Sequence, residues 1–182
     1  HKTLLIAAAK ALRPERVLLI PAFQAPLKGI AGALAGQRVE MLRALVSGLP
    51  KGLRKRCSLD LSEVRSKRKV YTVETLKRLA RKFSSRQVPQ GARDARRRLA
   101  KKHPEAELHF VVGSDSADTF HLWRDPEALR RLAFWWAGVR PGAGKRLPPR
   151  FNKLPGRFPD ISSTDIRLAI ATGGRWKKLV PK

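Results

Sequence analysis

The sequence contains very little cysteine, few acidic residues and no long apolar run. Its single cysteine, Cys57, has no second thiol in the chain to pair with, so an internal disulfide and a cysteine-based zinc cluster are both excluded. No stretch of the 182 residues is apolar for long enough to cross a bilayer, and the chain shows no basic-then-apolar leader with a cleavage site. We therefore expect neither membrane association nor secretion, and we predict a protein of the reducing cytoplasm.

The shortage of acidic residues leaves the chain strongly positive. Lys and Arg together number 40 against 14 Asp and Glu, which gives a formal net charge of +26. The excess is concentrated in residues 65 to 102, where the only acids are Glu74 and Asp94. A field of this sign attracts polyanions and phosphorylated ligands. Because aromatic residues do not alternate with these charges as a stacking platform requires, we favour a solvated surface, and nucleic acid is the less favoured partner.

Hydrophobic spacing predicts helices that alternate with short apolar strands. The predicted helices span residues 2–12, 37–48, 72–83, 126–132 and 164–172, and the predicted strands span residues 16–20, 57–64, 107–113 and 134–139. This alternation indicates an α/β fold with a mostly parallel sheet and flanking helices. The first helix feeds a strand, which is half of a βαβ unit, so we expect the strand that precedes this helix to be missing from the chain.

The length suits one domain, and we assign residues 1–182 to it. Residues 84–103 are polar and basic and are predicted to be an insertion within that domain. Residues 142–157, rich in Gly, Pro, Lys and Arg, are predicted to be a loop. Because ligands bind at the carboxyl ends of parallel strands, we expect the site in the loops that follow the strands and at the turn into the last helix.

The start of the last helix has the residues of a phosphate site. Ser162 and Ser163 stand where an N-cap belongs, so free backbone N–H groups and the positive end of the helix dipole should face outward there. Arg167 follows one turn later and can reach the same point. Hydroxyls, amides and a guanidinium together bind phosphate. On this pattern alone, a plain capped helix with a surface arginine remains open.

Three further positions follow predicted strands and favour a nucleotide. Gly113-Ser114-Asp115 comes after a buried strand, where glycine permits a close approach and a carboxylate suits a pair of sugar hydroxyls. Trp123 lies in a polar stretch and could stack on a flat ring, although a core tryptophan fits equally well. Arg140 ends the next strand and adds a cation at the same edge of the sheet.

In order and spacing, these motifs resemble those of bacterial nicotinate-nucleotide adenylyltransferases. The resemblance covers nearly the whole chain. The matching pieces are His1, Val17-Leu18-Leu19-Ile20-Pro21, Lys28, Arg38 with Met41-Leu42, Glu63, Tyr71-Thr72-Val73-Glu74-Thr75-Leu76, Val111-Val112-Gly113-Ser114-Asp115, Trp123-Arg124, Arg140-Pro141-Gly142 and Ile161-Ser162-Ser163-Thr164-Asp165-Ile166-Arg167.

The resemblance implies a Rossmann-like nucleotidyltransferase fold whose missing first strand is central in the sheet. It also implies the reaction of ATP with nicotinate mononucleotide to give deamido-NAD and pyrophosphate, with Mg²⁺ bound to the ATP. By the same resemblance His1 and Arg167 are catalytic. The implied ATP-binding residues are His1, Gly113, Asp115, Ser162, Ser163, Thr164 and Arg167. The implied contacts to the second substrate are Lys28, Thr75, Trp123 and Arg140.

Some positions depart from the family pattern and leave two other interpretations. Of the family's HxGH motif only the last histidine is present, as His1, and Val70 stands where serine is usual. One alternative is a degenerate relative that binds RNA or another polyanion through its basic face. The other is a sister nucleotidyltransferase that uses nicotinamide mononucleotide or phosphopantetheine. Trp123 and Thr75 favour nicotinate mononucleotide as the acceptor.

Overall fold

The computed structural model describes residues 1–27, 32–83, 106–141, 146–178 and 180. The basic insertion predicted at 84–103 therefore lies outside the described residues, as does Lys28. In the described part the elements follow in the order α1 (Lys2–Leu12), β1 (Val17–Leu19), α2 (Ala35–Ser47), α3 (Lys51–Arg54), β2 (Cys57–Leu59), α4 (Ser62–Ser66), α5 (Thr72–Phe83), β3 (His109–Gly113), α7 (Ser114–Asp118), η2 (Phe120–Leu122), α8 (Pro126–Leu132), β4 (Phe134–Gly138), β5 (Phe151–Lys153), α9 (Ser163–Ala171) and η3 (Trp176–Lys178).

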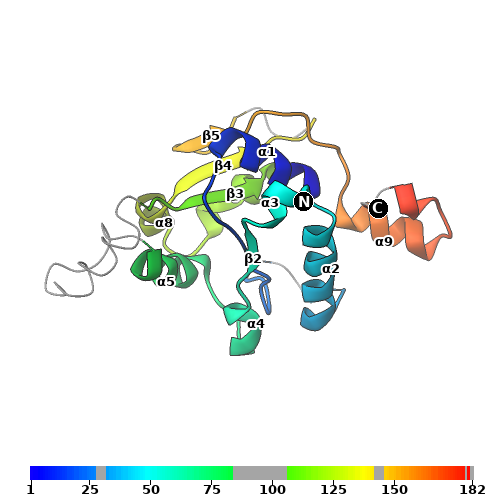
Figure 1. Ribbon diagram of the computed structural model, residues 1–182, viewed down its shortest axis with the longest axis horizontal. Helices are drawn as coiled ribbons and strands as arrows, with labels where there is room; N and C mark the ends of the chain where they lie inside the picture. The colour runs from blue at the N-terminus through cyan, green and yellow to red at the C-terminus, as the bar shows by residue number, and fades with distance from the viewer. Residues whose placement is uncertain (28–31, 84–105, 142–145, 179, 181–182) are drawn as a thin grey trace, which may run out of the picture.

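All described strand pairs are parallel, which confirms the α/β prediction. The strands form two sheets instead of one: β1 pairs with β2, and β3, β4 and β5 lie in that order (Figure 1). The register of the second sheet places Gly113 beside Gly138. Among the described residues, the two sheets share no strand, so β1 and β2 are separate from β3, β4 and β5.

Helix α1 packs against both sheets. One side of it, with Leu4 and Ala8, contacts Leu154 and Phe158 and the second sheet. The other side, with Leu5 and Ala9, packs with Leu49, Leu53 and Val17 around the first sheet. Figure 1 accordingly shows α1 between β4 and α3. The helix therefore buries apolar surface on two faces, as its sequence, apolar over most of its length, allows.

The approach of α1 to β4 depends on a glycine. Gly138 is buried at the end of β4, and a Cβ atom added there would overlap Leu4 Cδ1 and lie 3.2 Å from the ring of Phe158. The missing side chain thus lets helix and strand come together more closely than any other residue would allow.

The main core lies where α5 and α8, side by side in Figure 1, cover the second sheet. Its largest fully buried side chains include Trp135, Phe120, Leu76 and Leu129. The indole N–H of Trp135 donates to the Leu129 carbonyl oxygen at 2.9 Å, so this polar group is satisfied inside the core. Helix α5 buries Val73, Leu76, Leu79 and Ala80, as its apolar spacing predicts.

Two predictions about local structure were wrong. The predicted loop at 142–157 contains a strand, β5, which pairs with β4 through Phe151 and Lys153; three residues are too few to give a period in the sequence. The predicted strand at 57–64 ends at Leu59. The carboxylate of Asp60 accepts the Ser62 N–H at 3.0 Å and turns the chain into α4. The elements α3, α7, η2 and η3 were not predicted.

Candidate active site

The carboxyl ends of β3 and β4 bring two predicted site residues together. Because Gly113 and Gly138 are in register, the segments that follow them leave the sheet side by side. Arg140 Nη1 lies 3.4 Å from Asp115 Oδ2, an ion pair in which the arginine is the more buried partner. Gly113 itself has open space where a side chain would be, which leaves room for a ligand beside its backbone.

The first turn of α9 lies within reach of the charge of Arg140. Hydrogen bonds from the Ser162 hydroxyl and the Ser162 backbone hold the pKa of the Asp165 carboxyl below its usual range, and the positive charge of Arg140 lowers it further. Arg140 is therefore close enough to act on both Asp115 and Asp165. Arg140, two residues after β4, thus acts by its charge on the helix that carries the phosphate signature.

Helix α9 begins with a capping box, which the sequence analysis did not identify. The Ser162 Oγ accepts the Asp165 N–H at 3.1 Å, and the Asp165 carboxylate accepts the Ser162 N–H at 2.6 Å. The spacing Ser162-x-x-Asp165 is the signal that could have revealed it. The prediction of an N-cap at Ser162 is confirmed by this geometry. The side chain of Ser163 lies outside the described part of the structure.

Arg167 bends back toward the first turn of its own helix, as predicted. Its Nη2 donates to Thr164 Oγ1 at 3.1 Å. A Cβ atom on Gly32 would lie 3.5 Å from Arg167 Cδ, so the segment that leads into α2 passes beside this arginine. The guanidinium, the Thr164 hydroxyl and the start of α9 together form the cationic wall that a phosphate chain would need.

His1 lies at the start of α1. It is the N-cap residue of α1, and its side chain is exposed. Arg140 pairs with Asp115, and its charge also acts on Asp165, from a distant part of the sequence.

Trp123 belongs to an aromatic cluster, with part of its surface accessible. Its ring centroid lies 5.6 Å from that of Phe120, and it meets Trp135 and Phe110 edge-on at 5.8 and 6.3 Å. These contacts fix the plane of the indole. The side chain is half-buried, so both predicted roles fit: part of the ring packs in the core and part remains available to a ligand.

Thr75 is placed differently from the other predicted substrate contacts. It is 3% exposed, and its hydroxyl donates to Glu63 Oε1 at 2.5 Å. Burial raises the pKa of the Glu63 carboxyl, while the hydrogen bond from Thr75 and the charge of Arg78 act in the opposite direction. Nearby, Arg78 Nη2 pairs with Asp60 Oδ2 at 2.7 Å. The hydroxyl of Thr75 is thus already used to join α5 to α4, a role that the sequence did not reveal.

No group of three or more His, Cys, Asp or Glu side chains in the described ranges could hold a metal ion. No helix in that part of the chain is both long enough and apolar enough to cross a membrane.

Comparison with known proteins identifies the fold. A solved structure of Plasmodium falciparum nicotinic acid mononucleotide adenylyltransferase complexed with NaAD superposes with a TM-score of 0.54; it covers 91% of this chain and 74% of its own, at 13% identity. The chain accordingly has the Rossmann-like nucleotidyltransferase fold, as the sequence predicted. No protein-family model matches the chain.

Curated relatives identify the family. The protein named probable nicotinate-nucleotide adenylyltransferase of Laribacter hongkongensis is 34% identical over 196 residues, which cover 91% of this chain and 76% of the relative. The protein of the same name from Gloeobacter violaceus is 30% identical, with 97% and 82% covered. That of Marinobacter nauticus is 28% identical, with 100% and 83% covered. The chain belongs to the nicotinate-nucleotide adenylyltransferase family.

Proposed function

We propose that this chain transfers the adenylyl group of ATP to nicotinate mononucleotide, giving deamido-NAD and pyrophosphate in NAD biosynthesis. The observation that carries the proposal is the ion pair of Asp115 with Arg140 at the carboxyl edge of β3 and β4, where the charge of Arg140 also acts on Asp165 in the first turn of α9. Ligands of parallel α/β folds bind at this edge. Membership of the family supports the choice of reaction, because the relatives carry this enzyme's name.

The reaction needs no nucleophilic side chain. A phosphate oxygen of nicotinate mononucleotide attacks the α-phosphorus of ATP, and a new P–O bond joins the two nucleotides. The bond from that phosphorus to the oxygen leading to the β-phosphorus breaks, and its electron pair leaves with pyrophosphate. The protein contributes by aligning the two phosphates and by neutralising the charge that develops on the leaving group.

The phosphate-binding role falls to the cationic wall at α9. In the proposed complex Arg167 and His1 contact the ATP phosphates, and the start of the helix at Ser162, Ser163 and Thr164 supplies hydroxyls and backbone N–H groups. Gly113 and Asp115 contact the sugar of the nucleotide. Arg167 is held at the first turn by Thr164, so its charge needs little rearrangement to act there.

The acceptor is bound by a second set of residues in this proposal. The accessible part of the Trp123 ring packs on the nicotinate ring, and Arg140, Lys28 and Thr75 complete the contacts. Thr75 acts there through its backbone or after it exchanges its hydrogen bond to Glu63.

Mg²⁺ is proposed to be bound with ATP. Mg²⁺ usually keeps water and phosphate ligands with few carboxylates, so an ion carried by the ATP phosphates suits this reaction. The ion would neutralise part of the phosphate charge when bound. The single cysteine suits a reducing compartment, and we place the reaction in the cytoplasm.

The test is pyrophosphate release from ATP, Mg²⁺ and nicotinate mononucleotide. We expect Arg167→Ala and His1→Ala each to lower kcat by on the order of 10²–10³, the usual effect of removing one electrostatic contact to a developing charge. Arg131→Ala is the matched control, because it removes one exposed cation from the last turn of α8, away from this edge. Near-normal turnover of both site variants would refute their assigned roles.

The rival interpretations give different results in the same experiment. Turnover with nicotinamide mononucleotide in preference to nicotinate mononucleotide would identify a sister enzyme. Absence of turnover with either acceptor would refute the proposed function. RNA binding that persists at about 0.2 M salt would then favour a polyanion-binding module, because purely electrostatic contacts weaken steeply in that range.

A further inference from the structure

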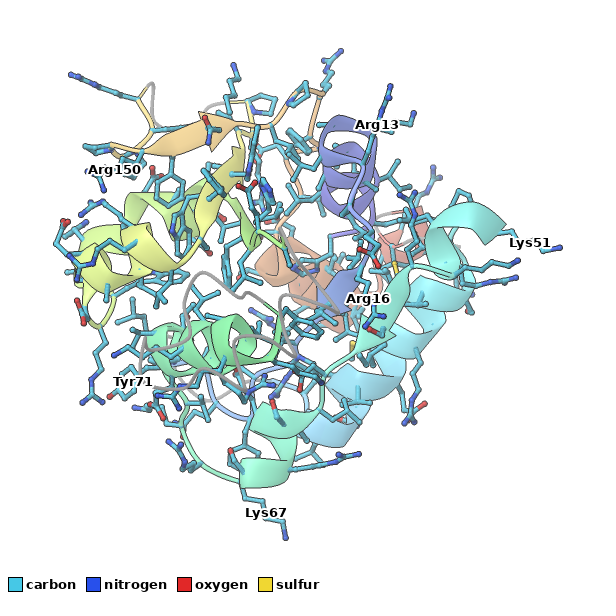
Figure 2. The ribbon with its side chains drawn as sticks, turned by 60° about the vertical axis from the view of Figure 1, so that its left-hand side comes forward. Arg13, Arg16, Lys51, Lys67, Tyr71 and Arg150 are labelled. Carbon is cyan, nitrogen blue, oxygen red and sulfur yellow. The ribbon has the colours of Figure 1, made fainter. Side chains whose placement is uncertain are left out.

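A group of exposed cations lies at the amino end of the first sheet. Half of them come from the last turn of α1 and its connection to β1, and the other half from α3 and its C-cap. All six side chains are exposed, and together they form the basic rim: Lys10, Arg13, Arg16, Lys51, Arg54 and Lys55. Figure 2 shows Arg13, Arg16 and Lys51 on the side of the molecule formed by α1 and α3, and Lys67 and Arg150 on other sides.

The fold holds the two halves of the basic rim together. Strands β1 and β2 pair from their first residues onward, and the Val17 N–H donates to the Arg56 carbonyl oxygen at 2.8 Å. The Arg56 guanidinium donates to the Pro14 carbonyl oxygen at 3.0 Å, which fastens the α1–β1 connection to the segment that follows α3. Beneath this surface Ala9 and Leu53 belong to one apolar cluster. The basic rim is therefore a surface fixed by the fold.

The positive charge of the basic rim is not neutralised by the protein. No carboxylate in the described ranges lies within 4.0 Å of any of its six cationic groups. The only acid in residues 10–16 and 50–56 is Glu15. By contrast, Arg68, Arg78 and Arg130 each have a carboxylate partner within that distance. The rim thus concentrates charge of a kind that other surfaces partly cancel.

The cations of α3 are also crowded. Lys51, Arg54 and Lys55 are three and four residues apart, so they share one face of this helical turn and its cap. Like charges at this spacing repel each other and destabilise the folded chain. A polyanion bound there would relieve the repulsion and would release its own counterions. The arrangement therefore favours a ligand with many closely spaced negative charges.

The composition of the basic rim discriminates among polyanions. No residue in 10–16 or 50–56 is aromatic, so the rim has no platform on which the bases of a single strand could stack. Leu53 is buried, and none of the large exposed hydrophobic side chains belongs to these segments, so the rim lacks the apolar anchor of a membrane-binding helix. A nucleic-acid duplex needs neither feature, because it presents about one negative charge per 1.7 Å of its axis.

We propose that the basic rim binds the phosphate backbone of double-stranded nucleic acid without regard to its sequence. The rim lies at the amino ends of β1 and β2, whereas the candidate active site lies at the carboxyl ends of β3 and β4. The two surfaces are formed by different elements, so a duplex and the mononucleotides can be bound at the same time. The inference does not depend on the proposed function, and the rim is separate from residues 65–102, where the sequence concentrates its charge.

The experiment measures the fluorescence anisotropy of a labelled DNA duplex of about 16 base pairs, between about 50 and 200 mM NaCl. Six phosphate contacts give a slope of about −5 when the logarithm of the association constant is plotted against that of the salt concentration, which is about a 10³-fold loss of affinity over this range. Removing three of the contacts should reduce the slope to about −3. The rim variant that does so combines Arg13→Gln, Arg16→Gln and Lys51→Gln.

The matched control removes the same charge from exposed positions outside the rim. It combines Lys67→Gln, Arg131→Gln and Arg150→Gln, and it should keep the wild-type slope. Lys67 and Arg150 have positive φ, as Arg13 does, so the control also matches the backbone conformation of a substituted rim residue. Equal weakening in the two triple variants would mean that net charge alone attracts the duplex, and it would overturn the role of the rim.

Further measurements separate the rim from the active site and from a lipid surface. Saturating duplex should leave pyrophosphate release unchanged, and ATP should not displace the duplex; displacement would place the duplex in the active site and overturn the proposal. A wild-type protein that binds vesicles of phosphatidylglycerol but not the duplex would overturn it too. Duplex binding is read without turnover, so failure of the proposed reaction would leave this inference standing, and absence of duplex binding would leave the reaction standing.

Discussion

Replacing Gly138 with alanine should loosen the contact between α1 and β4. The new methyl group would overlap Leu4 Cδ1 and approach the Phe158 ring at 3.2 and 3.3 Å, closer than an ordinary contact. Leu4 is half-buried and can swing away, but Phe158 is 5% exposed and confined by its neighbours. The overlap must therefore be relieved by a shift of α1 or by a strained ring position.

The magnitude follows from two opposing effects. Overpacking a well-filled site by one methyl group costs about 1–3 kcal/mol. Alanine also restricts the unfolded chain, which offsets about 0.4–1 kcal/mol, because Gly138 has no positive φ and alanine can adopt its backbone conformation. We therefore expect a net loss of about 1–2 kcal/mol in the free energy of unfolding.

Urea unfolding followed by tryptophan fluorescence provides the assay. With a slope of about 2 kcal/mol per molar urea, the middle of the usual range, the midpoint should fall by roughly 0.5–1 M. Gly36→Ala is the matched control, because this helical glycine has no heavy atom within 4 Å of the added Cβ and should become more stable by about 0.5–1 kcal/mol. In a double-mutant cycle, Leu4→Ala should cancel much of the cost of Gly138→Ala.

Two results would refute this reasoning. A Gly138→Ala protein as stable as the wild type would mean that helix and strand are not in close contact at this glycine. A double mutant whose losses simply add would mean that Leu4 is not the side chain that meets the new methyl group.

Three further predictions concern stability. Trp135→Phe should lower the free energy of unfolding by about 1–3 kcal/mol in urea titrations, since it leaves the buried Leu129 carbonyl without its indole donor; an unchanged midpoint would contradict this. Ser162→Ala should lower the free energy of unfolding by about 1 kcal/mol and speed amide hydrogen exchange in α9. Ser162→Thr should keep the cap, and equal exchange rates in the two variants would count against the capping box. Burial lowers the pKa of His109, and Glu107 opposes this with a smaller effect, so the folded state binds fewer protons than the unfolded state. The stability that depends on this histidine should be full above about pH 6.5 and should fall as the pH drops through this value. In a pH series of urea midpoints, His109→Phe should lack this loss.

Local pattern determined the helices and most of the strands. The spacing of Val73, Leu76, Leu79 and Ala80 predicts α5 with the bounds that the structure shows, because side chains three and four residues apart share one face of a helix. The residues around Ser162 likewise predict the start of α9. These features depend only on neighbours in the sequence, and the sequence contains all the information they need.

The contacts of the candidate site depend on residues far apart in the chain. Arg140 meets Asp115 because β3 and β4 pair in one particular register, and Thr75 donates a hydrogen bond to Glu63 because α4 turns out of the first sheet. Arg124 reaches Tyr71 only because α5 and α8 pack side by side. No periodicity encodes such pairings, which arise from the packing of whole elements. The sequence by itself therefore determined which residues could bind a nucleotide, and the tertiary structure decided which of them have free donors and which are already paired.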